Sequence, residues 1–102
     1  MTLVWTEDRI AAANGSNKMR LTMAQALIHY LACQKVELFD GTIVPLFGGI
    51  FGIYGHGNVA GLGEALWEYR SQIPFFRGQN EQGMAHAAIG YAKANHCRRI
   101  MA

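Results

Sequence analysis

The sequence has few charged residues, and they form no basic cluster. Charged residues make up 16% of the 102 positions, and nine Lys and Arg against seven Asp and Glu give a net charge of +2. Arg98 and Arg99 are the only adjacent basic residues. A nucleic-acid interface requires Lys and Arg gathered on one surface. We therefore expect no nucleic-acid partner.

Export signals, membrane segments and disulfide patterns are also missing. The amino-terminal segment contains Glu7 and Asp8 instead of the basic start and apolar run of a signal peptide. No stretch reaches the roughly 18 consecutive apolar residues of a membrane helix. Cys33 and Cys97 are isolated and form no CxxC motif, which favours reduced thiols over a disulfide. We expect a cytoplasmic protein with no membrane partner.

Apolar residues, by contrast, are abundant and account for 51% of the chain. A chain of this length corresponds to about one small domain, and this composition is sufficient to bury a core. The polar, turn-forming stretch Asn14-Gly15-Ser16-Asn17 is typical of a boundary. We interpret residues 1–18 as a leader and residues 19–102 as an incomplete domain.

Hydrophobic periodicity predicts helices and strands in alternation. Thr22 followed three residues later by Gln25 is a capping box, and apolar residues then recur at helical spacing. Residues 49–54 are apolar on both faces and bounded by glycine, which is typical of a buried parallel strand. The predicted helices are 23–34, 58–69 and 81–94, the predicted strands are 49–54, 73–76 and 99–102, and residues 36–48 are expected to form an irregular connection or short hairpin.

This order of elements predicts an α/β fold. We expect a partial three-layer structure, in which right-handed crossovers place helices on both faces of a parallel sheet. The last predicted strand reaches Ala102, where the sequence ends. Because a parallel sheet edge without its continuation is an unfinished domain, we expect the chain to be a truncated fragment.

The first candidate site is the loop Gly55-His56-Gly57-Asn58-Val59-Ala60. It matches the dinucleotide fingerprint G-x-G-x-x-A, and His56 lies at the carboxyl end of a strand, where open α/β sheets place their ligands. The acidic residue expected about 20 residues later is missing, because the next strand is followed by Arg77-Gly78-Gln79. A nicotinamide-dependent oxidoreductase stays open as an alternative, as does a noncatalytic module in which the glycines only make a tight turn.

The second candidate site is Glu81, at the start of the helix predicted over 81–94. A carboxylate in the first turn is ordinarily explained by the helix dipole, which contributes about 0.3–1 kcal/mol. The helix after it is rich in small residues, although each of its two glycines costs about 1 kcal/mol relative to alanine. We expect this small-residue face to pack very close to neighbouring elements. Its residues are Gly83, Ala85, Ala87, Ala88, Gly90 and Ala92.

The segment Asn80-Glu81-Gln82-Gly83 and the small residues after it resemble a helix of the acetolactate-synthase-like thiamine-diphosphate enzymes. In that family the helix bears the cofactor glutamate of the pyrimidine-binding domain. Residues 51–58 occupy the place of the family's first strand and glycine-containing loop, and the resemblance covers residues 20–27, 49–66 and 77–102. Many members carry proline after the loop glycine, where this sequence has His56. The match therefore favours a carbon–carbon bond hydrolase of myo-inositol breakdown over an acetolactate-synthase-like lyase or transferase.

The resemblance implies thiamine diphosphate as the cofactor, with Glu81 as the catalytic acid that bonds N1′ of the aminopyrimidine. It implies that Gly55 and His56 contact the cofactor, and that His56 and Gln82 approach the substrate, a cyclic polyhydroxy 1,2-dione. Mg²⁺ and the diphosphate are held in this family by a downstream domain that this sequence does not contain, so no metal ligand is expected here. The family also implies a homodimer or homotetramer at full length, and an inactive isolated fragment.

Overall fold

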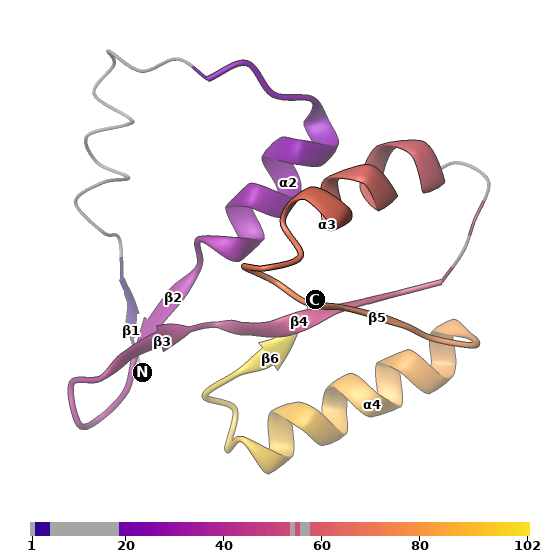
Figure 1. Cartoon of the computed structure of the whole chain (residues 1–102). Coiled ribbons are helices and arrows are strands. Elements are labelled where there is room, and N and C mark those ends of the chain that lie inside the picture. Colours follow the sequence, from indigo (N-terminus) through magenta and orange to yellow (C-terminus); the bar gives the residue numbers. More distant parts are fainter. Residues whose placement is uncertain (1, 5–18, 54, 56–57) are drawn as a thin grey trace.

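The chain folds into two small sheets, of which the second is flanked by helices (Figure 1). The computed structural model describes residues 2–4, 19–53, 55 and 58–102. In chain order the elements are β1 (Thr2–Val4), α2 (Met23–Ala32), β2 (Lys35–Glu37), β3 (Ile43–Pro45), β4 (Phe47–Gly52), η1 (Val59–Gly63), α3 (Glu64–Glu68), β5 (Phe75–Arg77), α4 (Glu81–Ala94) and β6 (Ile100–Met101).

The second sheet is parallel and has the order β5-β4-β6. The prediction of an α/β fold with a three-stranded parallel sheet is therefore confirmed. The middle strand was predicted two residues too late, since β4 spans 47–52 and not 49–54. The prediction of a strand over 73–76 was also shifted, because Ile73 still donates its backbone N–H to Tyr69 O at the end of the preceding helical turn and its side chain is buried.

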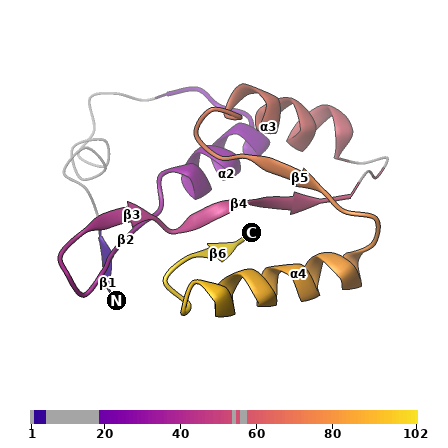
Figure 2. The same cartoon turned by 60° about the horizontal axis from the view of Figure 1, so that its bottom comes forward.

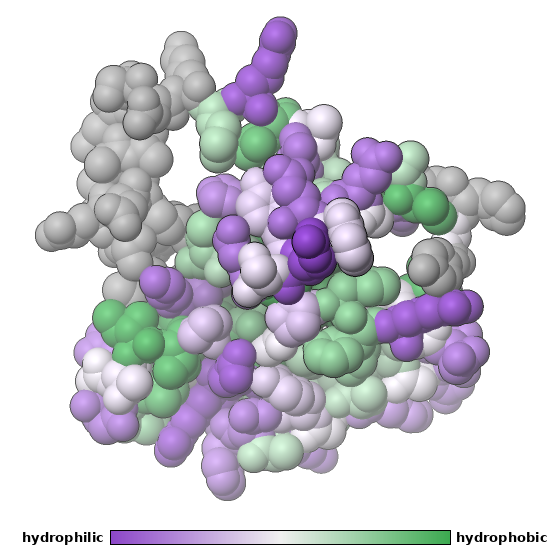
Figure 3. Space-filling model, in the orientation of Figure 1, coloured by the Kyte–Doolittle hydropathy of each residue, from purple (hydrophilic) through white to green (hydrophobic). Residues whose placement is uncertain are grey.

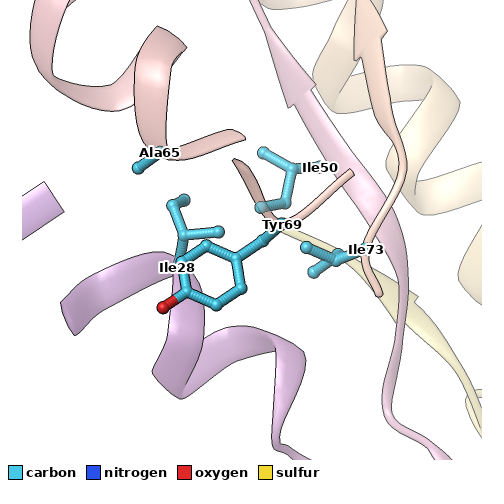
Figure 4. Packing of buried hydrophobic residues seen from close by; sticks show 5 residues of the cluster. All are labelled: Ile28, Ile50, Ala65, Tyr69 and Ile73. Atoms are coloured by element: carbon cyan, nitrogen blue, oxygen red, sulfur yellow. The ribbon is translucent and has the colours of Figure 1, made fainter. Parts of the chain in front are cut away.

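Helices cover both faces of the parallel sheet. Figures 1 and 2 show α2 and α3 on one face and α4 on the other. The first face holds the hydrophobic core, in which Ile28 of α2 packs with Ile50 of β4 and with residues of and after α3 (Figure 4). The five buried residues of this core are Ile28, Ile50, Ala65, Tyr69 and Ile73. The three predicted layers are thus present.

Helix α2 begins with the predicted capping box. Thr22 Oγ1 accepts from the Gln25 backbone N–H at 3.1 Å, and Gln25 Oε1 accepts from the Thr22 backbone N–H at 3.0 Å. The helix ends at Ala32, two residues before the predicted end, and the Gln34 side chain folds back to donate to Tyr30 O at 2.8 Å. This return bond satisfies a carbonyl of the last turn and closes the helix.

The first sheet is antiparallel, with β2 between β1 and β3. Strands β2 and β3 form the short hairpin predicted over 36–48. Its turn contains Asp40, which accepts from the Thr42 N–H at 3.0 Å, and Gly41, whose φ of 83° lies in the left-handed region that glycine adopts at low cost. Strand β1 lies within residues 1–18, and the interpretation of those residues as a leader stays a prediction.

Strand β4 contains three glycines that are covered by aromatic side chains. A Cβ atom on Gly48 would overlap the hydroxyl group of Tyr91 from α4. A Cβ on Gly49 would lie 2.7 Å from the Phe76 ring and 2.9 Å from Pro74 O, and one on Gly52 would lie 2.5 Å from the Phe75 ring. Glycine in a strand interior ordinarily weakens a sheet, and here the rings occupy the space that side chains would otherwise fill.

Two predictions about the helices were wrong in detail. The segment after Asn58 starts as the π-helical turn η1, where Gly63 N–H bonds Asn58 O at 3.0 Å, and the Asn58 side chain makes no capping bond. The small residues of α4 were expected to pack closely, yet α4 has no buried residue and a Cβ on Gly90 would meet nothing within 4 Å. The helix contacts the sheet through Met84, Ala88, Tyr91 and Ala92, which are partly buried, so Gly90 points away from the sheet.

Candidate functional site

The carboxyl ends of β4 and β5 lie side by side and bring the predicted site residues to one edge of the sheet. Gly52, the last residue of β4, pairs with Arg77, the last residue of β5. Gly55 follows three residues after the end of β4. Glu81 begins α4 four residues after the end of β5 (Figure 1). Open α/β sheets bind ligands at this edge.

The connection from β5 to α4 is held by backbone and side-chain hydrogen bonds. The Gly78 N–H donates to Gly52 O at 2.8 Å, which ties the start of the connection to the end of β4. Asn80 caps α4, since its Oδ1 accepts from the Gly83 N–H at 2.7 Å. Asn in this role satisfies one of the free N–H groups of the first turn. Helix α4 therefore begins at Glu81 and ends at Ala94, as predicted.

Glu81 is exposed at this helix start. In the part of the chain that the structure describes, its carboxylate has no hydrogen-bond or ion-pair partner. The partial positive charge of the helix amino terminus favours a carboxylate there. The Glu81 carboxylate is thus an available acceptor at the edge where open α/β sheets bind ligands.

The other predicted site residues are Gly55, Gln82 and His56, and the structure describes the first two of them. Gly55 is exposed, and a Cβ atom there would meet nothing within 4 Å, so its backbone is open to approach. Gln82 is exposed on α4, but consecutive helix residues project about 100° apart and do not share a face with each other. His56 lies outside the described residues. The structure therefore brings Glu81 and Gly55 to the same edge and does not align Gln82 with Glu81.

A cavity of about 640 Å³ opens between the α2–α3 layer and the parallel sheet. No sequence pattern predicted this cavity. Gly55, Asn58 and Val59 of the first candidate loop line it, and Glu81 does not. Among the described residues that line it, Arg70 alone is charged, and its guanidinium lies 4.1 Å from the centre of the Trp67 ring. Leu27 and Leu31, two of the apolar residues at helical spacing in α2, also line this cavity.

Apolar residues also reach the outer surface. Figure 3 shows one apolar area beside the parallel strands and another over the β2–β3 hairpin. In the hairpin, the side chain of Phe39 is 84% exposed and that of Ile43 is 51% exposed. No helix in the described part of the chain has the length and apolar character that crossing a bilayer requires.

Metal-ligating residues do not converge in the described ranges, where no three of His, Cys, Asp and Glu lie close enough to hold an ion. The nearest arrangement is a pair on α2 and its cap, in which Cys33 Sγ lies 3.8 Å from His29 Nε2. Two ligands on one helix are fewer than the three or four protein ligands of zinc sites.

A parallel α/β sheet with an unpaired carboxylate at its carboxyl edge is an architecture of ligand-binding α/β domains. Comparison with known proteins narrows this class. Over 84 residues, the chain is 51% identical to the 3D-(3,5/4)-trihydroxycyclohexane-1,2-dione hydrolases of Listeria monocytogenes serotype 4b (strain F2365), Bacillus thuringiensis (strain Al Hakam) and Bacillus cereus (strain 03BB102). The matched region is 82% of this chain and 13% of each hydrolase.

The chain is therefore similar to these hydrolases over most of its own length and corresponds to a small part of theirs. This confirms the resemblance found in the sequence, and it favours the hydrolase over the acetolactate-synthase-like alternative. No family model matches the chain, and no solved structure matches it.

Proposed function

We propose that this chain is a segment of a thiamine-diphosphate-dependent hydrolase that opens a cyclic polyhydroxy 1,2-dione at a carbon–carbon bond. The observation that carries the proposal is the 51% identity over 84 residues to hydrolases named for such a substrate. In this proposal residues 19–102 form part of the pyrimidine-binding domain. The diphosphate and Mg²⁺ bind to another part of the full-length protein, which acts in the cytoplasm as a homodimer or homotetramer.

The residues at the sheet edge fit this cofactor. The aminopyrimidine requires an acid that can share a proton with N1′, and the Glu81 carboxylate is an acceptor without a partner in the described structure. The ring also requires a backbone without an obstructing side chain, and space beside Gly55 is open. Bound thiamine diphosphate supplies a carbon nucleophile and an electron sink for carbon–carbon cleavage.

The role of this chain is then to hold and move one proton. Glu81 would hold this proton at its carboxyl group and share it with N1′ of the aminopyrimidine. In the described chain Glu81 is exposed, so this segment alone does not enclose the cofactor ring. An active site completed by another domain or subunit is therefore part of the proposal, and His56 and Gln82 are candidates for substrate contacts within it.

The proposal is tested by Glu81→Gln in the full-length protein. The amide cannot give a proton to N1′, so exchange of the C2 proton of bound thiamine diphosphate should slow by at least about 100-fold, the lower part of the range for loss of acid–base catalysis. The measurement is deuterium exchange followed by NMR at saturating cofactor.

Glu64→Gln provides the matched control, because Glu64 is also an exposed carboxylate in the first turn of a helix but lies in α3. This variant should exchange at the unmodified rate. If Glu81→Gln and Glu64→Gln gave the same rate, Glu81 would not be the cofactor acid.

A further inference from the structure

Glu81 begins α4 directly after the short connection from β5, and a side chain from the first turn of α4 packs back over that connection. A Cβ atom on Gly78 would overlap Cγ and Sδ of Met84, so the Met84 side chain lies directly across the Gly78 backbone. Gly78 and Met84 are both partly buried, whereas the residues between them are exposed. The contact therefore spans the connection from the end of β5 to the second half-turn of α4.

This contact is joined to two hydrogen bonds that fix the same segment. The Gly78 N–H is bound to Gly52 O at 2.8 Å, which anchors the segment to the neighbouring strand. At the other end, the Met84 N–H donates to Asn80 O at 3.2 Å as part of the first helical turn. The thioether of Met84 thus links the first turn of α4 to a backbone position that is hydrogen-bonded to β4.

Glu81 itself has no partner that would fix its position in the described structure. Its carboxylate is placed only by the direction in which α4 leaves the sheet. Functional groups must be held within roughly 0.5 Å of their productive geometry, and this is achieved by neighbours whose own positions are locked by packing. The contact between Met84 and Gly78 is the packing contact that bridges this segment on both sides of Glu81.

We propose that Met84, seated on Gly78, is a positioning residue that sets the direction of Glu81 at the edge of the sheet. The inference rests on the proposed function of Glu81. It also assigns a reason for the glycine at position 78, since a Cβ atom there would displace the Met84 side chain from its seat.

The test uses Gly78→Ala, Met84→Ala, the double variant and Met84→Leu in the full-length protein. Exchange of the C2 proton of thiamine diphosphate is measured at saturating cofactor, so that weaker binding does not lower the rate. Gly78→Ala should slow exchange on the order of 10- to 100-fold, the effect of displacing a catalytic group by about 1 Å. Met84→Leu keeps a side chain of similar volume and should stay within about threefold of the unmodified rate.

The double variant separates positioning from general damage. Met84→Ala removes the two atoms that a Cβ on Gly78 would meet, so the double variant should exchange faster than Gly78→Ala alone. Hydrogen–deuterium exchange of the peptide spanning residues 78–84 should follow the same order, with the fastest backbone exchange in Gly78→Ala. Gly61→Ala is the control, because a Cβ there meets only Ala24 Cβ at 3.9 Å, and it should change neither readout.

Two results would overturn the inference: an unmodified C2 exchange rate in Gly78→Ala, or a double variant that is as slow as Gly78→Ala or slower. Glu81→Gln is measured in the same series. If Glu81→Gln is slow while Gly78→Ala is normal, the positioning role fails and the role of Glu81 stands. If Glu81→Gln is itself normal, the proposed function fails.

Discussion

The two faces of the parallel sheet differ in how tightly the helices pack against them. On the α2–α3 face, aliphatic side chains and Tyr69 pack into a buried cluster (Figure 4). On the α4 face the helix buries no residue, and the Tyr91 hydroxyl lies over Gly48 of β4. Hydrophobic stabilisation scales with the apolar area removed from water. The α2–α3 face therefore supplies most of the stability of this segment.

The candidate site belongs to the weaker face. Glu81 begins α4, and its placement depends on Gly78 and Met84 rather than on the main core. Residues that act on ligands need exposed positions, whereas residues that stabilise the fold need buried ones. This division predicts that substitutions on the two faces affect different properties.

The largest effect is expected from Ile73→Ala. Ile73 is 1% exposed in the core, and removing a buried aliphatic side chain costs about 2–5 kcal/mol of unfolding free energy. Ile89→Ala is the matched control on α4, where Ile89 is 54% exposed, and it should cost less than about 0.5 kcal/mol. Urea denaturation followed by circular dichroism measures both. Equal losses would show that the two faces contribute alike.

A second comparison uses one glycine in close contact with its neighbours, Gly49 of β4, and one in open space, Gly90 of α4. In Gly49→Ala the added Cβ would lie 2.9 Å from Pro74 O, a backbone atom that cannot rotate away, so we expect a loss of about 1–3 kcal/mol. In Gly90→Ala the Cβ meets nothing within 4 Å, and replacing a helical glycine should add about 0.5–1 kcal/mol.

Both variants are measured by urea denaturation of this chain, and Gly90→Ala is also measured in the full-length protein. Stabilisation of the short chain together with destabilisation of the full-length protein would show that further protein covers this face of α4. Destabilisation of the short chain by Gly90→Ala would contradict the exposure of Gly90 described here.

Sequence patterns predicted those elements whose signals are local. The capping box at Thr22 predicted the start of α2, because it depends on side chains within one turn of the helix. The start of α4 at Glu81 was also predicted, and Asn80 caps it in the structure. Strand ends were predicted less well. Ile73 has the composition of a strand residue, but its burial under α2 and α3 and its bond to Tyr69 O keep it in the helical turn.

The candidate site was predictable only in part. Resemblance to the hydrolase family placed Glu81 and Gly55, and their meeting at one edge follows from parallel strand pairing. The contact between Gly78 and Met84 has no sequence signal, since the two lie six positions apart and neither is unusual alone. The orientation of α4 was also beyond prediction, because small residues lie around its whole circumference and periodicity could not show which side faces the sheet.

A smaller effect is expected at the end of α4. His96 and Cys97 follow the helix with φ values of 51° and 58°, and left-handed backbone costs a residue with a Cβ about 1–2 kcal/mol. Cys97→Gly removes this cost and should raise the unfolding free energy by about 1 kcal/mol. Cys33→Gly at the cap of α2, where φ is −83°, should lower it by about 0.5–1 kcal/mol. Thermal unfolding of both variants checks the pair, and a loss of stability in Cys97→Gly would be the contrary result.

The smallest effect concerns the hairpin turn. It lies beside the segment after α4, where the Arg98 guanidinium is 5.9 Å from the centre of the Phe39 ring. The hydrogen bond from the Thr42 backbone N–H lowers the pKa of Asp40 below its usual value of 3.8. A lowered pKa means that the native state favours the ionised carboxylate. The contribution of Asp40 is therefore present above about pH 4, and it is lost as the pH falls through the lowered pKa. Asp40→Asn keeps an acceptor for Thr42 but cannot ionise, so the difference in unfolding free energy between the two proteins should shrink from pH 6 to pH 2. A difference that stays constant over that range would show that the charge of Asp40 does not stabilise the turn.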